Sequence, residues 1–315
     1  MQPITATVLI PTYKRARYLQ QTLEAFTHLN SPPDTFEVLI VDNNSPDHTR
    51  EVVAAFAEAH SAFHIRYVFE GRQGVSYARN RGITEAQGEI ICLLDDDSPP
   101  EPEWLNALLS AFDDPTVGCV GGPAELDYQG QVRPPWLEGD LQGMLSGFSL
   151  PYSTVTPVSA WEQLPYSCNM AVRRRLFAEL GAFRPDLDRA GNQALAAGDT
   201  EMGKRILEAG WQVLYNPEAK VRHIVAPERL KFDYLYHIGR GLAASHVILT
   251  GDPRPHQVLR WLASDLWYAT RMLARLVLAV VRRKRLWLDD YIVFWTVARR
   301  IPYRLHKIFN GSMRA

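Results

Sequence analysis

The chain contains few cysteines, and none of them is arranged as in a disulfide framework or a zinc site. Among its 315 residues, Cys92, Cys119 and Cys168 lie far apart and form no C-x-x-C pair. Two of them fall within apolar runs, so a reducing compartment fits this sequence best. The first residues lack a basic segment followed by an apolar run, and we therefore expect no secretory signal.

The chain also lacks internal repeats, low-complexity segments and a net excess of charge. Its formal charge is -1, with 46% apolar and 22% charged residues, as in ordinary soluble globular proteins. We expect no nucleic acid among its partners. The charge is unevenly distributed, because 13 Lys or Arg stand against 3 acidic residues from Arg254 to the end. A basic, aromatic-rich tail on an acidic body predicts an anionic surface as the partner of the tail.

The most informative stretch is an apolar run that ends in three consecutive aspartates. Ile90–Leu94, preceded by Gly88, is predicted to be a strand buried on both faces. Asp95, Asp96 and Asp97 follow directly, at the end of a strand where open α/β sheets bind their ligands. Adjacent carboxylates repel unless they are neutralised, and a divalent cation that carries phosphate oxygens is the simplest neutraliser. The alternative is a solvated acidic turn.

Strands and amphipathic helices alternate through the first part of the chain. Strands are expected at 7–10, 36–41, 64–69 and 90–94, each followed by a polar loop. The first strand is expected to break at Pro11. This alternation predicts an α/β fold, with a mostly parallel sheet between helices on both faces and with the strand-to-helix loops along one edge. Asp42, which follows the second strand, should therefore lie near the three aspartates.

The rest of the body is predicted to extend the sheet and to include one irregular segment. A helix that begins at Trp104 and short strands at 117–120 and 168–172 continue the alternating pattern. Residues from about 127 to 165 are rich in Gly, Pro and Ser and show no clear period. We interpret them as a loop-rich insertion and a candidate lid.

Two further polar residues follow this insertion. Asp199 lies at the N-terminal end of a helix that stops at Gly210, where an ionised carboxylate is stabilised by about 0.3 to 1 kcal/mol. His223 lies in the second of two extended segments, 211–215 and 219–224. Both residues also have a purely structural interpretation, Asp199 as a helix N-cap and His223 as a hydrogen-bonded histidine of the fold.

Five sequence segments stand in a fixed order along the chain. They are V-L-I-P-T-Y-K-R, V-L-I-V-D-N-N-S, A-R-N-R-G-I, I-I-C-L-L-D-D-D and G-D-T-E-M-G-K-R-I-L-E-A-G-W-Q-V-L-Y-N-P-E-A-K-V-R-H. In this order they resemble the family 2 glycosyltransferases of the non-processive bacterial type, over roughly residues 5 to 240. The resemblance implies the GT-A fold and the transfer of a sugar from a nucleotide diphosphate to an acceptor, usually with inversion.

The resemblance also implies roles for the residues at matching positions. The implied donor-binding residues are Thr12, Tyr13, Arg15, Asp42, Arg79, Asp95 and Asp96. Among them, Asp42 would face the base or ribose, and Arg79 the diphosphate. Mn²⁺ or Mg²⁺ would be held by Asp97, Asp95 and His223, with Asp97 as the more direct ligand. Two alternatives stay open: Asp42 could cap its turn with Ser45, and Arg79 could be a surface charge.

The same resemblance implies a general base. Cleavage of a sugar nucleotide develops negative charge on the diphosphate, which a cation held by carboxylates stabilises without proton transfer. Asp199 matches the second acid of the family's E-D pair and would accept the proton of the incoming hydroxyl. The first acid of that pair is replaced by Gly198 in this sequence, and Glu201 is the candidate to compensate.

The tail has the features of a helix that lies on a membrane surface. The stretch from Trp261 to Val281 is nearly long enough to cross a bilayer, but Asp265, Arg271 and Arg275 interrupt it. The two arginines share a helix face, and the basic cluster 282–285 follows, which favours adsorption to anionic lipid. The alternative is a helical pair that docks on the catalytic domain or forms a dimer interface.

One further pattern lies at the start of this stretch. Gln257, Arg260 and Trp261 spell Q-x-x-R-W, which is found in processive polysaccharide synthases. We interpret the match as chance, because it lies 58 positions after Asp199 and the chain lacks a set of spanning helices. The preceding segment better fits the non-processive members.

The sequence as a whole predicts a GT-A catalytic domain over residues 1–240, with a nucleotide-binding half to about residue 125 and an acceptor half at 126–240. A helical, basic region over residues 241–315 would associate with membrane or form an oligomer. We expect an inverting glycosyltransferase at the cytoplasmic face of the cell membrane. Its donor would be a nucleotide-diphosphate sugar, first of all a UDP-sugar, and its acceptor a glycan or polyprenyl-linked sugar in surface polysaccharide or glycolipid synthesis.

Two other functions stay open at this point. A sugar nucleotidyltransferase would need a glycine-rich first loop, whereas P-T-Y-K-R contains no glycine. A non-catalytic module that binds nucleotide sugar or glycan at a membrane has the missing acid at Gly198 as its only indication. Turnover of a sugar nucleotide would separate these functions from a glycosyltransferase.

Overall fold

The computed structural model of the chain describes residues 4–134, 137, 141–190, 193–194, 197–249, 255–281 and 294–310. These residues form two compact units. The sheet unit comprises the described residues of Met1–Asp127, Ser146–Pro185 and Gly198–Ile224. The helical unit comprises those of Tyr128–Leu145, Asp186–Ala197 and Val225–Ala315.

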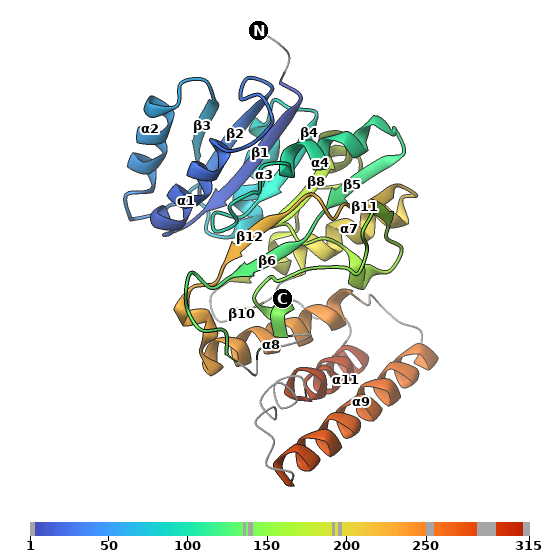
Figure 1. The fold of residues 1–315 in the computed structure, drawn as a ribbon. Helices are drawn as coiled ribbons and strands as arrows, with labels where there is room; N and C mark the ends of the chain where they lie inside the picture. The colour runs from blue at the N-terminus through green and yellow to red at the C-terminus, as the bar shows by residue number, and fades with distance from the viewer. Residues whose placement is uncertain are drawn as a thin grey trace. The chain divides into compact units, whose positions relative to one another are not determined.

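The sheet unit is built on an eight-stranded sheet with strand order β3-β2-β1-β4-β8-β5-β11-β7 (Figure 1). The strands are β1 (Ala6–Thr12), β2 (Phe36–Asp42), β3 (His64–Phe69), β4 (Ile90–Leu94), β5 (Val117–Gly121), β7 (Thr156–Pro157), β8 (Asn169–Arg173) and β11 (Gln212–Tyr215). Neighbouring strands are parallel, except where β8 meets β4 and β5 and where β7 meets β11. The prediction of a mostly parallel sheet is confirmed.

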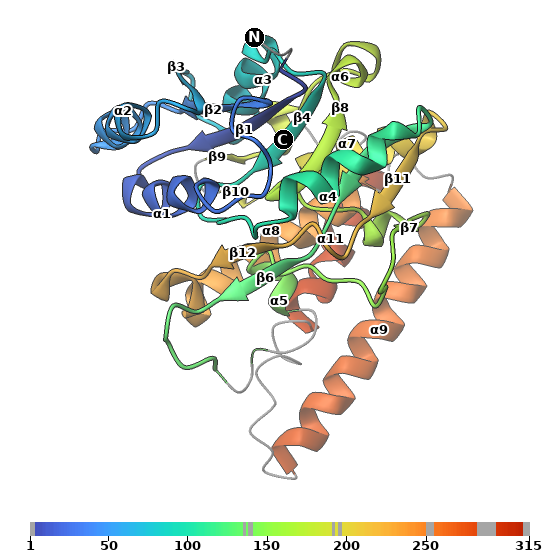
Figure 2. The same ribbon diagram turned by 45° about the horizontal axis from the view of Figure 1, so that its top comes forward.

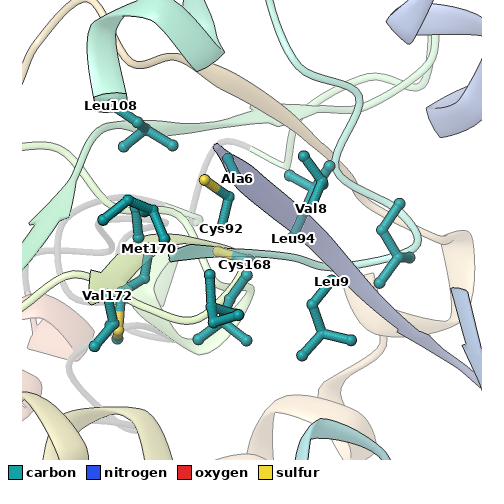
Figure 3. Close-up of a cluster of buried hydrophobic side chains, with 14 of the residues drawn as sticks. Ala6, Val8, Leu9, Cys92, Leu94, Leu108, Cys168, Met170 and Val172 are labelled. Carbon is teal, nitrogen blue, oxygen red and sulfur yellow. The ribbon is translucent and has the colours of Figure 1, made fainter. Parts of the chain in front are cut away.

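Helices cover both faces of this sheet, as predicted. They are α1 (Ala16–Phe26), α2 (Thr49–Ala59), α3 (Val75–Glu85), α4 (Trp104–Ser110), α6 (Arg174–Leu180) and α7 (Gly198–Glu208). Figure 3 shows Cys92 of β4 and Leu108 of α4 on one side of the sheet and Leu9 of β1 on the other. Gly82 of α3 packs so closely on Leu9 that an added Cβ atom would lie 2.1 Å from Leu9 Cδ1. Strands buried on both faces explain the near-continuous apolar runs in the sequence.

The first strand continues through Pro11, so the predicted break there is wrong. β1 pairs with β2 through its last residue, Thr12, but with β4 only as far as Leu9. Thr12 O accepts a hydrogen bond from Asn43 N on the β2 side. Successive residues of a strand direct their backbone N–H and C=O groups to opposite neighbours. Because Thr12 faces β2, Pro11 N faces the β4 side, where the pairing has already ended. The missing N–H of the proline therefore costs no hydrogen bond of the sheet.

The antiparallel strand β8 begins at the edge of the sheet where β4 ends. Asn169 of β8 pairs with Leu94, the residue before the three aspartates. The Asn169 side chain is buried; its Nδ2 donates to Ala219 O at 2.7 Å and to Pro123 O at 2.9 Å, and its Oδ1 accepts from Trp104 Nε1 at 2.8 Å. These bonds hold the start of β8 in place. The residues just before Asn169 consequently lie at the same edge as the aspartates.

A second, two-stranded sheet brings His223 to this edge. β6 (Ala124–Asp127) pairs in parallel with β12 (Val221–Ile224), and the two strands lie side by side in Figures 1 and 2. The backbone of β12 also bonds to the loop after β4, because Ile224 N donates to Asp97 O at 2.8 Å. His223 is therefore placed beside Asp97 by backbone hydrogen bonds.

The predicted loop-rich insertion is divided between the two units. Its residues from Tyr128 to Leu145 belong to the helical unit and include the short helix α5 (Leu141–Met144). From Ser146 onward it belongs to the sheet unit and includes β7 and a 3₁₀ turn at Trp161–Gln163. Trp136 lies outside the described residues, and a lid function stays a prediction.

The helical unit consists mainly of α8 (Phe232–Leu249), α9 (Pro255–Val281) and α11 (Arg300–Asn310), with the short strands β9 (Arg189–Ala190) and β10 (Gln193–Ala194). α11 packs against both α8 and α9. Buried Asp265 of α9 accepts a hydrogen bond from Arg304 Nε of α11 at 2.5 Å, and Arg300 Nη1 lies 3.8 Å from its other oxygen. The Arg304 guanidinium lies over the Trp261 ring, 5.0 Å from its centroid. Because loss of one partner of a buried ion pair costs about 3 to 5 kcal/mol, these contacts join α9 firmly to α11.

Among the described helices, none combines the length and the apolar character needed to traverse a bilayer. The predicted basic cluster 282–285 lies outside the described residues. Arg271 and Arg275, which interrupt the apolar stretch in the sequence, are exposed on α9.

His246 of α8 makes the stability of the helical unit depend on pH. Burial and the nearby Arg300 and Arg304 lower the pKa of His246 to about 3. Between that pH and the ordinary histidine pKa of about 6.5, the unfolded chain binds a proton that the folded chain does not. The free energy of unfolding should therefore fall as the pH decreases through this range, by at most about 1.4 kcal/mol per pH unit from this residue.

His246→Gln tests this prediction because it removes the titrating group. Chemical denaturation followed by circular dichroism should show a flatter dependence of the unfolding free energy on pH in the variant, between about pH 6.5 and pH 5. Equal slopes in the two proteins would contradict the prediction, whatever their difference in stability at neutral pH.

Candidate functional site

Asp96 joins the loops that follow β1 and β4. Thr12 Oγ1, at the end of β1, donates to Asp96 Oδ2 at 2.8 Å, and Arg15 Nη1 donates to Asp96 Oδ1 at 3.2 Å. Thr22 Oγ1 of α1 donates to the backbone oxygen of Asp96 at 2.9 Å. Burial raises the pKa of the Asp96 carboxyl, and the charge of Arg15 opposes this shift. All these contacts connect parts of the protein, so Asp96 has a clear structural role.

Two guanidinium groups partly neutralise the three aspartates. Arg15 also donates to Asp97 Oδ2, and Arg79 Nη2 lies 3.6 Å from Asp95 Oδ1. Arg79 is buried, and its guanidinium lies over the Phe183 ring at 5.3 Å from the centroid. Arg79 Nε has no hydrogen-bond partner among the described residues. Arg79 is therefore not the surface charge of the alternative interpretation, and it has a donor to offer to an anion.

Asp95, Asp97 and His223 form a group that fits a divalent metal ion. One carboxylate oxygen of each aspartate and one ring nitrogen of His223 lie within 4.8 Å of one another. His223 Nε2 is 3.4 Å from Asp97 Oδ1, and both residues are buried. Two carboxylates and an imidazole are ligand types that divalent transition metals accept. The burial of Asp96 and Asp97 also excludes the solvated acidic turn.

Asp42 ends β2 beside Thr12, its register partner in β1. Its Oδ1 accepts a hydrogen bond from Ser45 N at 2.9 Å, and its Oδ2 accepts one from Tyr67 OH at 2.6 Å. Burial, this hydrogen bond and the charge of Asp42 raise the pKa of Tyr67 to about 12. Asp42 thus caps its turn, and its role at a base or ribose stays a prediction. Tyr13, next to Thr12, is exposed at this edge of the sheet.

Asp199 lies in the first turn of α7 and is held from the start of β8. Ser167 N and Ser167 Oγ both donate to Asp199 Oδ2 at 3.2 Å. The adjacent Cys168 is buried, and its pKa is raised by burial first and then by the charges of Asp95, Asp199 and Asp97. Ser167 also lies two residues before Asn169, which pairs with Leu94, the residue before the three aspartates. The structure brings Asp199 into the neighbourhood of the predicted metal ligands.

Glu201, the candidate to compensate for Gly198, is engaged in a different contact. Arg205 Nη2 lies 2.9 Å from Glu201 Oε2. The same guanidinium donates to the carbonyl oxygens of residues 180–182 at 2.5 to 3.0 Å. Glu201 thereby helps to tie α7 to the end of α6. Its expected role as a substitute acid gains no support from this geometry.

Two residues with clear roles at the site were missed from the sequence. Ser167 stands in a short polar segment without a recognisable spacing, and only the antiparallel insertion of β8 reveals its contact with Asp199. Tyr67 does have a signal in the sequence. Tyr67 pairs with Ile40 in the β2–β3 register. Asp42 lies two residues after Ile40, so the side chains of Tyr67 and Asp42 are on the same face of the sheet.

Comparison with known proteins agrees with this arrangement. The family model described as "Glycosyl transferase family 2" matches residues 7–181. Glycosyltransferase AglE of Haloferax volcanii is 27% identical over 234 residues, which cover 74% of this chain and 71% of that protein. The glucosyl-dolichyl phosphate glucuronosyltransferase of the same organism is 25% identical over 236 residues, which cover 72% of each protein.

A solved structure supports the assignment of the fold. Mannosyltransferase PcManGT from Pyrobaculum calidifontis, in complex with GDP-Man and Mn²⁺, superposes with a TM-score of 0.63 at 22% identity. The match covers 98% of this chain and 88% of that chain. At this identity the likeness shows the GT-A fold alone, whereas the family model covers more than half of the sequence. The chain therefore belongs to family 2 of the glycosyltransferases.

Proposed function

We propose that this glycosyltransferase moves a sugar from a metal-bound nucleotide diphosphate to an acceptor hydroxyl with inversion at the anomeric carbon. The observation that carries the proposal is the meeting of two sets of groups at one sheet edge. Asp95, Asp97 and His223 offer ligands to a metal. Asp199 is held by Ser167, two residues before Asn169, which pairs with Leu94 beside the aspartates, and it offers a proton acceptor.

The donor half of the site is built to receive a diphosphate. When bound, the metal stabilises the negative charge that develops on the diphosphate as its bond to the sugar breaks. Arg79 adds a positive charge that is fixed by burial and by its stacking on Phe183. Thr12, Tyr13 and Arg15 line the nucleotide pocket in this proposal.

The acceptor half needs a base on the side opposite the leaving diphosphate, because inversion proceeds by a single displacement. The acceptor oxygen forms a bond to the anomeric carbon, the bond to the diphosphate oxygen breaks, and the hydroxyl proton passes to Asp199. Ser167 holds Asp199 Oδ2 through two donors. Among the described hydrogen bonds, Asp199 Oδ1 accepts only from Thr200 N, in its own helix turn. Oδ1 is therefore the oxygen that takes the proton in this proposal.

The ligand set favours Mn²⁺ over Mg²⁺ in this proposal. Mg²⁺ is bound chiefly by oxygen ligands and water, whereas an imidazole suits transition metals. His223 supplies that nitrogen. Asp96 is tied to Thr12 and Arg15 and takes no part in the ligand set.

For the substrates, we propose a UDP-sugar as donor and a glycan or lipid-linked sugar as acceptor, at the cytoplasmic face of the cell membrane. The name of the glucuronosyltransferase from Haloferax volcanii gives a lipid-linked acceptor for that relative. Residues 1–240 form the catalytic domain in this proposal. The product would enter a surface polysaccharide or glycolipid.

Thermal unfolding with single nucleotides tests the donor site. UDP or a UDP-sugar should stabilise the protein in the presence of Mn²⁺ and far less with Mn²⁺ chelated, because Asp95, Asp97 and His223 would hold a cation that neutralises the charge of the diphosphate. A nucleotide at 100 times its dissociation constant adds about 2.7 kcal/mol to the free energy of unfolding.

The GDP counterparts, tested in parallel, show whether uracil or guanine is preferred. Stabilisation followed by sugar transfer to a lipid-linked or glycan acceptor supports the proposal. Stabilisation without turnover of any donor would indicate a non-catalytic binding module instead. No stabilisation by any nucleotide would overturn the proposed function altogether.

A further inference from the structure

One side of helix α9 packs within the helical unit, and another side is apolar and exposed. Asp265, Ala269 and Met272 are buried and recur at helical spacing. The exposed apolar residues are Leu266, Trp267, Leu273, Val277 and Leu278, with 45 to 61% of their surface accessible. At about 100° per residue these five residues lie on one side of the helix, and we call them the α9 apolar face.

The α9 apolar face carries no negative charge. Asp265 is the one acidic residue in the sequence of α9. It points into the helical unit, where Arg304 Nε donates to its carboxylate at 2.5 Å. The aspartate that interrupts the apolar stretch in the sequence is thus removed from the exposed side by the fold.

Basic residues run along one edge of the α9 apolar face. Arg260, Arg271 and Arg275 are exposed, and their spacing of eleven and four residues places them within about 60° of one another around the helix. The Arg271 guanidinium lies over the Trp267 ring, 5.4 Å from its centroid. An apolar face with tryptophan and an arginine edge is typical of helices that lie in the interface of a bilayer.

The charges also decide between lipid and a second copy of the chain. If two α9 helices paired through this face, each would present arginines to the other without an acid on the helix to match them. Anionic lipid headgroups supply the missing negative charge. The sequence adds Arg282, Arg283, Lys284 and Arg285 directly after α9, which increases the positive charge at that end.

We propose that the α9 apolar face docks on a membrane surface rich in anionic lipid. Leu266, Leu273 and Val277 enter the boundary between headgroups and acyl chains, and the arginine edge contacts lipid phosphates. The buried pair of Asp265 and Arg304 fixes which side of α9 is presented. This surface is additional to the proposed reaction and does not depend on it.

Flotation of the full-length protein with vesicles tests the proposal. The protein should float with vesicles of phosphatidylglycerol and phosphatidylcholine and much less with phosphatidylcholine alone, and the binding should weaken steeply with salt. Val277→Glu places a negative charge on the face and should weaken binding at least about tenfold. Val155→Glu is the matched control, because Val155 is an exposed valine of the sheet unit with 49% of its surface accessible against 55% for Val277.

A second pair of variants tests the arginine edge separately. Removing both Arg271 and Arg275 by substitution with Gln should weaken binding about thirtyfold, at about 1 kcal/mol for each basic residue near the surface. Arg17→Gln, an exposed arginine of α1, serves as control. Nucleotide-dependent stabilisation should be unchanged in every variant, which shows that the sheet unit is folded. Trp267→Gln replaces Val277→Glu if the latter fails to fold.

Three results would overturn the proposal. The full chain could fail to float with anionic vesicles at low salt. Val277→Glu and Val155→Glu could weaken flotation equally. Sedimentation could show a dimer that Val277→Glu dissociates while flotation stays the same, which would assign the face to a second copy of the chain.

Discussion

Asp97→Asn is expected to lower the affinity for Mn²⁺ at least about a hundredfold and to abolish metal-dependent nucleotide binding. Asp97 contributes an oxygen to the ligand group with Asp95 and His223. An amide keeps the shape of the carboxylate but loses its charge. The fold should persist, because Asp97 lies in the loop after β4 and not among the apolar residues between the sheet and its helices. Calorimetry of Mn²⁺, and of UDP in the presence of Mn²⁺, measures both effects.

Asp96→Asn is the sharpest control for this prediction, because it lies one residue away. Asp96 bonds to Thr12 and Arg15 and is outside the ligand group. Its variant should therefore change stability while leaving the Mn²⁺ affinity within a few-fold. Unchanged binding of UDP with Mn²⁺ in Asp97→Asn would remove Asp97 from the site. Equal losses in both variants would mean that the acidic loop acts as a unit.

The backbone around this site could largely be predicted from the sequence. β3 and β4 occupy the predicted residues. β4 is an apolar run bounded by turn residues, and β3 is rich in the β-branched and aromatic residues that favour strands. Parallel strands joined by helices bring their carboxyl ends to one edge, which explains why Asp42 and the aspartates were expected to be close. Pro11 was misjudged because its effect depends on which neighbouring strand still pairs at that position.

The partners of the charged side chains could not be predicted in the same way. Arg15 is 81 residues from Asp96 in the sequence, and the loop geometry after two strands decides that they meet. Ser167 reaches Asp199 only because β8 enters the sheet antiparallel, a feature that apolar periodicity does not encode. Such contacts depend on tertiary placement to within an ångström or so, whereas a buried strand needs only a run of apolar residues.

The charged residues of the tail carry two kinds of information, one in their number and one in their spacing. Counting charges in the stretch from Trp261 to Val281 argued correctly against an ordinary spanning helix. At helical spacing, Asp265 lies on the same side of the helix as Ala269 and Met272, and this side is buried. A carboxylate on a buried helix side requires a partner, and Arg304 provides it.

Asp199→Asn is expected to leave nucleotide binding intact and to lower sugar transfer at least about a hundredfold, the usual contribution of a positioned general base. The amide can still accept hydrogen bonds from Ser167 N and Oγ, so its orientation should be kept. The amide NH₂ group takes the place of Oδ1, so the capacity to take the acceptor proton is lost together with the bond from Thr200 N. Thermal stabilisation by nucleotide and Mn²⁺, measured beside the transfer rate, separates binding from chemistry. Near-normal turnover would instead make Glu201 the better candidate, despite its pair with Arg205.

Ser167→Ala then distinguishes a base that Ser167 orients from an aspartate that merely begins helix α7. The alanine keeps the backbone N–H bond to Asp199 Oδ2 but loses the hydroxyl donor, which stabilises the ionised carboxylate. Sugar transfer should therefore fall about tenfold, the scale of one hydrogen bond to a charged group, while stabilisation by nucleotide and Mn²⁺ stays unchanged. Ser167→Thr, which retains a hydroxyl, should restore the rate, whereas a change in stability alone would not be rescued in this way. If Asp199→Asn is inactive and Ser167→Ala transfers sugar normally, Asp199 is the base and the Ser167 hydroxyl does not orient it. If both variants transfer sugar normally, the proton goes to another group.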